Sequence, residues 1–181
     1  TNIPGDERPW LELSPPATIN PHARQAILDA DLVVVAPGLL YGSLAPALLV
    51  RGVTRALAET KAKKVYVCNL VTKPTQTDGF TVADFVDEIE RFAGVSMDYV
   101  LYNNYRPPQA LLDKYAHNGE YLVEWDEAEL KKKHYYASGK HLIANGIRHH
   151  NKKADPLAAL RSLIRHDSDK IARELMRIYF S

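Results

Sequence analysis

The chain has 181 residues, 46% of them hydrophobic and 25% charged, and 23 Lys and Arg against 22 Asp and Glu leave a net charge of +1. These proportions are typical of a soluble globular protein, and the length favours a single domain over residues 1–181. The balanced charge argues against a dedicated nucleic-acid binder, and no apolar run reaches the roughly 20 residues that a membrane helix needs.

The first predicted elements are a helix and a buried strand. Residues 1–16 are proline-rich and expected to be irregular, apart from a short strand at residues 10–13. Asn20 before Pro21 is a helix start signal, which predicts a helix to about residue 29. Residues 32–35 then form the unbroken apolar run LVVV, typical of a parallel strand that is buried on both faces.

A glycine-bearing loop follows this strand. Pro37, Gly38 and Gly42 interrupt the apolar run, and Ser43 is a candidate N-cap for a helix expected to reach residue 59. The N–H groups and the dipole at such a helix start can hold a phosphate without a lysine. The spacing matches neither the dinucleotide fingerprint nor the P-loop, so an ordinary turn between strand and helix is the alternative.

The remaining elements repeat this alternation. A strand at residues 64–69 and a polar loop at residues 72–79 precede a helix that starts at a Thr81–Asp84 capping box and stops at Gly94. The later expected elements are a strand at 98–103, a helix at 109–116, a strand at 120–125, a helix at 127–132, a strand at 140–144 and a final helix from Ser168. The alternation predicts an α/β, Rossmann-like three-layer fold with a mainly parallel sheet.

Polar residues fall where the predicted strands end, which is where such sheets bind ligands. The loop from Asn69 to Gly79 offers Asn69 and Thr72 to a ribose or phosphate, and Asp78 is a candidate to hold a metal or take a proton. A polar surface loop is the alternative interpretation. The single cysteine, Cys68, excludes an internal disulfide, is interpreted as a small buried residue rather than a nucleophile, and fits a reducing cytoplasmic location.

Arg165 stands just before the final helix, whose N-cap is either Asp167 or Ser168. A guanidinium beside a positive helix end suits a diphosphate, and simple capping with a solvent-facing arginine is the alternative. Ser168 is also a candidate phosphorylation site, because a phosphate is favoured at a helix N-terminus.

Three segments resemble the CofD/YvcK superfamily in content and order: DLVVVAPGLLYGS at 31–43, KAKKVYVCNLVTKPTQTDGFT at 61–81 and IRHD at 164–167. One branch of that superfamily is 2-phospho-L-lactate transferase, which moves a phospholactyl group from a guanosine diphosphate carrier to a deazaflavin. The other is the gluconeogenesis factor, a regulator that binds UDP-sugars and affects bacterial carbon use and cell shape. The PGLLYGS loop resembles the version found in the regulator.

The resemblance implies a UDP-sugar or nucleotide diphosphate ligand, and it places Tyr115 and Arg165 at that ligand. Together with the loops, the expected ligand-binding residues are Gly38, Leu40, Tyr41, Ser43, Asn69, Thr72, Tyr115 and Arg165. Ser168 stands where the regulator carries a phosphorylated threonine. A homodimer is left open.

A phospholactyl-type transferase is the alternative function, and Mg²⁺ would then be expected as cofactor, with Asp78 assisting; the regulator interpretation requires no cofactor and no resident metal. Family members begin with a strand and a Gly-Gly-Gly-x-Gly type of loop, which this sequence lacks. The resemblance therefore implies that residues 1–181 are the C-terminal portion of a longer CofD-like domain.

Overall fold

The computed structural model describes residues 10–144 and 163–181. Four parallel strands form one sheet in the order β1-β2-β3-β4, with β1 at Leu32–Val35, β2 at Lys63–Val67, β3 at Tyr99–Asn103 and β4 at Tyr136–Lys140. The helical elements are α1 (Pro21–Asp29), the π-helical turn η2 (Leu40–Leu44), α2 (Ala45–Leu48), α3 (Val53–Glu59), α4 (Val82–Ala93), α5 (Gln109–Ala116), α6 (Glu127–Leu130) and α7 (Ser168–Tyr179).

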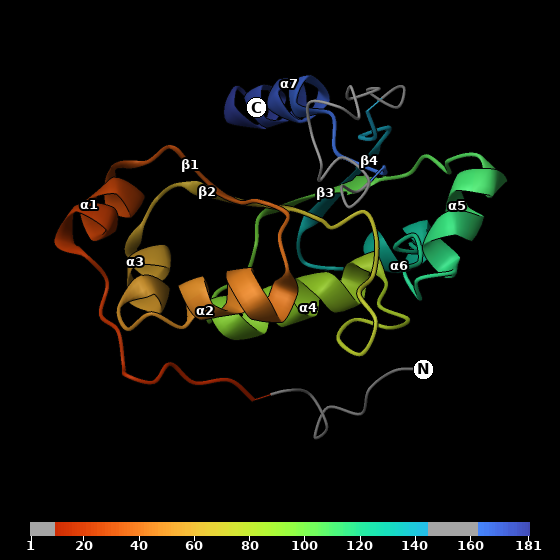
Figure 1. Ribbon diagram of the computed structural model, residues 1–181. Coiled ribbons are helices and arrows are strands. Elements are labelled where there is room, and N and C mark those ends of the chain that lie inside the picture. The colour runs from red at the N-terminus through yellow and green to blue at the C-terminus, as the bar shows by residue number, and fades with distance from the viewer. Residues whose placement is uncertain (1–9, 145–162) are drawn as a thin grey trace, which may run out of the picture.

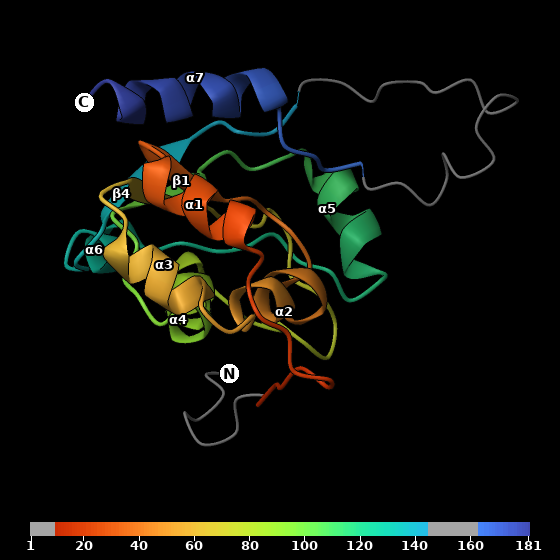
Figure 2. The same ribbon diagram turned by 90° about the vertical axis from the view of Figure 1, so that its left-hand side faces the viewer.

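The elements form three layers. Figures 1 and 2 both show α7 on one side of the sheet and α2, α3 and α4 on the other. This arrangement confirms the predicted Rossmann-like α/β fold with a parallel sheet. Among the described residues, no helix has both the length and the apolar character needed to cross a membrane.

Apolar side chains fill the space on each side of the sheet. The larger cluster joins the strands to α2 and α4, and its fully buried members include Tyr66, Phe85 and Ile89. The smaller cluster joins Val65, Val67 and Leu101 to α7. Successive strand residues point to opposite faces, so β2 contributes alternately to both clusters.

The helix caps that the sequence predicts for α1 and α4 are present in the structure. The Asn20 side chain accepts a hydrogen bond from the His22 N–H at 2.8 Å and starts α1. Thr81 and Asp84 form the predicted capping box of α4, and Gly94 ends that helix with a φ of 68°. Asp167, rather than Ser168, caps α7 by accepting hydrogen bonds from two backbone N–H groups.

The helix expected from Ser43 to residue 59 is wrong as a single element. Leu39 is the N-cap of η2, so Ser43 lies inside the π-helical turn and does not cap it. The chain then breaks between α2 and α3 at Gly52, whose φ of 96° belongs to the left-handed region that favours glycine. This turn lets α2 and α3 pack separately on the sheet.

Three strand predictions also need correction. Residues 10–13 form no strand. Residues 120–125 form only isolated bridges, Val71 with Leu122 and Thr81 with Glu124, because this segment pairs with the loop after β2 instead of the sheet. The last sheet strand is β4 at Tyr136–Lys140, before the expected 140–144. Its sequence YASGK lacks the apolar run by which strands are recognised.

Gly139 explains part of this unusual strand composition, because it lies opposite the buried Tyr102 on β3. A Cβ atom at residue 139 would lie 2.7 Å from two atoms of the Tyr102 side chain. We expect Gly139→Ala to lower the free energy of unfolding by about 1–3 kcal/mol, the usual cost of overpacking. Urea unfolding would measure this, and an unchanged midpoint would show that Tyr102 can shift at no cost.

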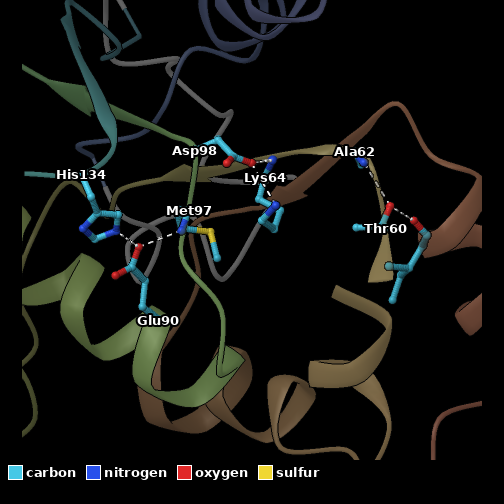
Figure 3. A network of polar contacts seen from close by, with 8 residues as sticks. Thr60, Ala62, Lys64, Glu90, Met97, Asp98 and His134 are labelled. Atoms are coloured by element: carbon cyan, nitrogen blue, oxygen red, sulfur yellow. Dashed lines mark hydrogen bonds and ion pairs between the residues drawn. The ribbon is translucent and has the colours of Figure 1, made fainter. Parts of the chain in front are cut away.

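Polar side chains brace the amino-terminal edge of the sheet (Figure 3). Glu90 accepts hydrogen bonds from the Met97 N–H at 2.7 Å and from His134 at 2.8 Å. Asp98 accepts from the Lys64 N–H at 2.7 Å, and its carboxylate lies 3.1 Å from the Lys64 ammonium group. These residues join the starts of β2 and β3 to the end of α4, so their polar groups are accounted for by the fold.

Candidate functional site

The carboxyl-terminal edge of the sheet brings together loops that are far apart in the sequence. The Asn69 side chain, just after β2, donates a hydrogen bond to the Gly38 carbonyl at 2.8 Å and so fastens the second loop to the first. His166 Nε2 lies 3.1 Å from the Cys68 carbonyl, at the same end of β2. A carbonyl can only accept, so Nε2 carries the proton and donates. These two contacts place three loops at one edge.

The segment before α7 is docked on this edge through its backbone. The Ile164 N–H donates to the Tyr115 hydroxyl at 2.6 Å, and both residues are buried. The Arg165 carbonyl accepts from the Ala144 N–H at 2.9 Å, and the Asp167 N–H donates to the Leu142 carbonyl at 2.7 Å. The Tyr115 hydroxyl on α5 therefore lies beside the segment that carries Arg165, and Arg165 itself is exposed.

The loop after β1 turns two of its expected ligand-binding side chains inward. Leu40 is 1% exposed and belongs to the core. The Tyr41 hydroxyl donates to Glu88 Oε2 at 3.2 Å, and its ring packs edge-on against Phe92 at 6.0 Å between centroids. Leu40 and Tyr41 can therefore face a ligand through their backbone, whereas Ser43 is exposed.

Beneath this loop lies a buried carboxylate that the sequence did not single out. Glu88 is 0% exposed, and Arg91 one turn later donates to it from Nη2 at 2.6 Å and Nε at 3.0 Å. Through Tyr41 the pair also fixes the π-helical turn η2. These bonds hold the loop after β1 in one position. π-helical turns often occur at functional sites, which agrees with a role of this loop in binding.

The loop after β2 serves two structural roles. Thr72 is buried, its N–H donates to the Tyr121 carbonyl at 2.8 Å, and its hydroxyl accepts from the Tyr121 N–H at 3.1 Å. Thr72 also lines a cavity of about 590 Å³ between this loop, α5 and the segment 121–124, together with Phe80, Arg106 and Leu112. Gly38 and Asn69 do not line this cavity, so the expected ligand residue Thr72 does not share it with them.

Asp78 is exposed on the same loop. Within residues 10–144 and 163–181, no group of three or more His, Cys, Asp or Glu side chains is placed to hold a metal ion. Ser168 is exposed at the first position of α7.

Buried groups at this edge have shifted pKa values. Burial raises the pKa of the Cys68 thiol to about 12, so the thiol is protonated at neutral pH and is a poor nucleophile. Burial lowers the pKa of His166, opposed by its hydrogen bond to the Cys68 carbonyl. His141 stacks on Tyr105 with ring centroids 3.9 Å apart, and burial followed by the charge of Lys170 lowers its pKa as well.

His166 should make the protein sensitive to acid. Its pKa is lower in the folded chain than in the unfolded chain, so the unfolded chain binds more protons below about pH 6.5 and stability falls as the pH decreases. We expect His166→Gln to flatten part of this loss, leaving the part due to His141. Urea unfolding between pH 7.5 and 5 would measure it, and parallel curves for the two proteins would contradict it.

His166, Glu88 and the Tyr105–His141 stack are the site residues that sequence reasoning did not assign. His166 could have been assigned from the sequence, because it stands between Arg165 and Asp167 in the IRHD segment. Its partner is a backbone carbonyl 98 positions away, which no local pattern indicates. Glu88 looks like an ordinary surface residue in a charged helix until its burial is known.

Comparisons with known proteins agree with this architecture. A protein of Thermotoga maritima, provisionally named a gluconeogenesis factor, is 36% identical over 168 residues, covering 93% of this chain and 50% of that protein. The gluconeogenesis factor of Bacillus subtilis is 32% identical over 157 residues, covering 86% of this chain and 45% of that protein. The chain thus spans about half the length of these relatives.

A solved structure has the same fold. The crystal structure of a UPF0052 family member from Bacillus halodurans superposes with a TM-score of 0.75 at 28% identity, covering 88% of this chain and 46% of that chain. The family model described as 2-phospho-L-lactate transferase CofD matches residues 7–143, which is more than half of the sequence. The chain therefore belongs to the CofD family.

Proposed function

We propose that this chain forms one wall of a UDP-sugar site in a regulator of the gluconeogenesis-factor type, which acts in bacterial carbon use and cell shape. The relatives from Bacillus subtilis and Thermotoga maritima carry that name, and the chain spans about half of each. The observation that carries the proposal is the convergence of the Gly38, Asn69 and Arg165 segments at the carboxyl-terminal edge of the sheet.

The chemistry of this edge suits a diphosphate. The first N–H groups of a helix have no partner within the helix, and the turn η2 begins in the loop that follows β1. Arg165 adds a planar cation that can donate two parallel hydrogen bonds to phosphate oxygens. Neither group needs a metal to bind an anion, and a nucleotide sugar carries its charge on the diphosphate.

The alternative is a phospholactyl-type transferase that uses a guanosine diphosphate donor. The description of the matching family model favours it. That chemistry would use Mg²⁺ beside the diphosphate, and Asp78 is the candidate carboxylate on the second loop. The regulator is preferred because the relatives from Thermotoga maritima and Bacillus subtilis carry that name.

Thermal unfolding with ligands separates the two functions. The chain is tested alone and as a chimera joined to the part of the Thermotoga maritima relative that lies outside the matched segment. A ligand at about 100 times its Kd adds about 2.7 kcal/mol, which raises the melting temperature by several degrees. A rise with UDP-N-acetylglucosamine supports the regulator, a rise with GDP and a deazaflavin supports the transferase, and no rise in either protein with UDP-sugars contradicts the proposal.

A further inference from the structure

Two aromatic rings meet where β3 and β4 end. Tyr105 follows β3, His141 follows β4, and their rings stack with centroids 3.9 Å apart and an angle of 17° between the ring planes. The connection that carries Tyr105 leaves the end of β3 toward α5 (Figure 1). Parallel α/β sheets bind ligands beyond the carboxyl ends of their strands. The stacked pair therefore lies at the edge of the sheet where a ligand is expected.

A buried asparagine fastens the two segments of the stack to each other. Asn103, the last residue of β3, is 6% exposed. Its side-chain nitrogen donates a hydrogen bond to the Tyr105 carbonyl at 2.7 Å, and its side-chain oxygen accepts one from the Leu142 N–H at 3.2 Å. The backbones that carry Tyr105 and His141 are therefore held in place by the fold.

His141 supplies the face of its ring to this stack. Its Nε2 atom is buried and has no hydrogen-bond partner among the residues that the structure describes. A buried polar atom without a partner costs free energy, so a hydrogen bond of Nε2 does not explain the histidine at this position. Tyr105 remains 39% exposed although its ring lies against His141. The pair, here called the Tyr105–His141 platform, thus combines a backed aromatic ring with open surface.

The platform adjoins the segment that carries Arg165. Ile143 and His166 form an antiparallel bridge, and the Ala144 N–H donates to the Arg165 carbonyl at 2.9 Å. His141 precedes Ala144 by three positions, which is about 10 Å along an extended chain. In a nucleotide, the ribose separates the base from the phosphates. The platform and Arg165 are therefore placed to meet the two ends of one such molecule.

We propose that Tyr105, backed by His141, stacks on the nucleobase of the nucleotide diphosphate whose phosphates lie at Arg165. This inference rests on the proposed function and names where the base of that ligand lies. Every nucleobase has a flat π-face, so stacking on an aromatic ring recognises the class of ligand and leaves the choice of base to other groups.

A stack that serves packing alone makes a different prediction. Such a stack would affect the stability of the protein and would not distinguish a ligand with a base from a ligand without one. UDP and inorganic diphosphate separate the two roles, because both carry the diphosphate group and only UDP carries a base. Isothermal titration calorimetry measures both ligands, with the chain or the chimera, whichever binds UDP-N-acetylglucosamine.

The variants should divide the ligand into its two parts. Tyr105→Ala should weaken UDP binding by about 10- to 100-fold and leave the affinity for inorganic diphosphate unchanged, because only the base loses its stacking partner. Arg165→Ala should weaken the binding of both ligands. Tyr105→Phe should bind UDP like the wild type, since stacking requires the ring and not the hydroxyl.

Tyr136→Ala is the matched control. Tyr136 is 66% exposed and also packs against an aromatic ring, that of Tyr99, at 5.9 Å between centroids. It lies at the first position of β4, which is the opposite edge of the sheet, so its removal should leave UDP affinity unchanged. Should Tyr105→Ala fail to fold, nuclear Overhauser effects between the Tyr105 ring and the base protons of UDP are measured in the wild type.

The outcomes separate this inference from the proposed function. UDP binding that Tyr105→Ala leaves intact, or a wild-type complex without contacts between the Tyr105 ring and the base, overturns the inference alone. Equal weakening of UDP and inorganic diphosphate by Tyr105→Ala also overturns it, because the ring would then act on the site as a whole. No binding of UDP or UDP-sugars by either protein overturns the proposed function and this inference together.

Discussion

Replacing Arg165 with alanine is expected to weaken binding of UDP-N-acetylglucosamine by about 10- to 100-fold, because a hydrogen bond to a charged group contributes about 1.5–3 kcal/mol. The unliganded protein should melt within about 1–2 °C of the wild type, since Arg165 is exposed and its carbonyl still accepts from Ala144. Isothermal titration calorimetry on the protein that shows the thermal shift would measure the affinity.

Two variants sharpen this test. Arg165→Lys keeps the charge but loses the planar fork, so its affinity should fall between those of the wild type and Arg165→Ala. Arg177→Ala removes an arginine with a 68% exposed side chain near the far end of α7 and should leave the affinity unchanged. Equal affinity of Arg165→Ala and wild type would remove Arg165 from the site without affecting the fold assignment.

Replacing Tyr115 with alanine is expected to lower the free energy of unfolding by about 3–5 kcal/mol, the usual cost of removing a buried aromatic ring. Tyr115 is 6% exposed and packs against Leu70, Ile143 and Ile164. Tyr115→Phe keeps the ring and leaves the buried Ile164 N–H without its hydroxyl acceptor, which costs about 1–3 kcal/mol. Urea unfolding would measure both variants.

Tyr115→Phe should also loosen the segment before α7 locally. In Tyr115→Phe the amide of Ile164 should exchange faster while the amides of β2 and β3 keep their protection, because the lost bond holds only the segment before α7. Tyr121→Ala is the control, since Tyr121 is 55% exposed and its backbone contacts to Thr72 remain. A Tyr115→Phe protein with wild-type stability and wild-type exchange would show that the hydroxyl does not dock the segment.

The elements that could be predicted from the sequence are those with strong local signals. β1 was predicted at its observed bounds, and α1 and α4 start at their expected caps. β4 could not be found in this way, because its glycine is required by the packing of Tyr102, a residue of a different strand. The break before α3 depends likewise on the left-handed Gly52, which a helical pattern with one glycine does not reveal.

The candidate site was predictable in part. The resemblance pointed to Tyr115 and Arg165, and the structure places them on adjoining segments because the Tyr115 hydroxyl binds the backbone beside Arg165. The inward turn of Tyr41 was not predictable, since its partner Glu88 lies 47 positions away on α4. Sequence patterns describe which residues follow one another, and a site is defined by which residues meet in space.

The hydrogen bonds that join the three loops of the site both end on main-chain oxygens, those of Gly38 and Cys68. A carbonyl oxygen is present whatever side chain the residue carries, so the two ends of each bond are under unequal constraint. Position 68 can vary among small apolar residues. Asn69 and His166 can be replaced only by side chains of similar length that still donate a hydrogen bond. A survey of natural or randomised variants should therefore find variation at position 68 and near-invariance at positions 69 and 166.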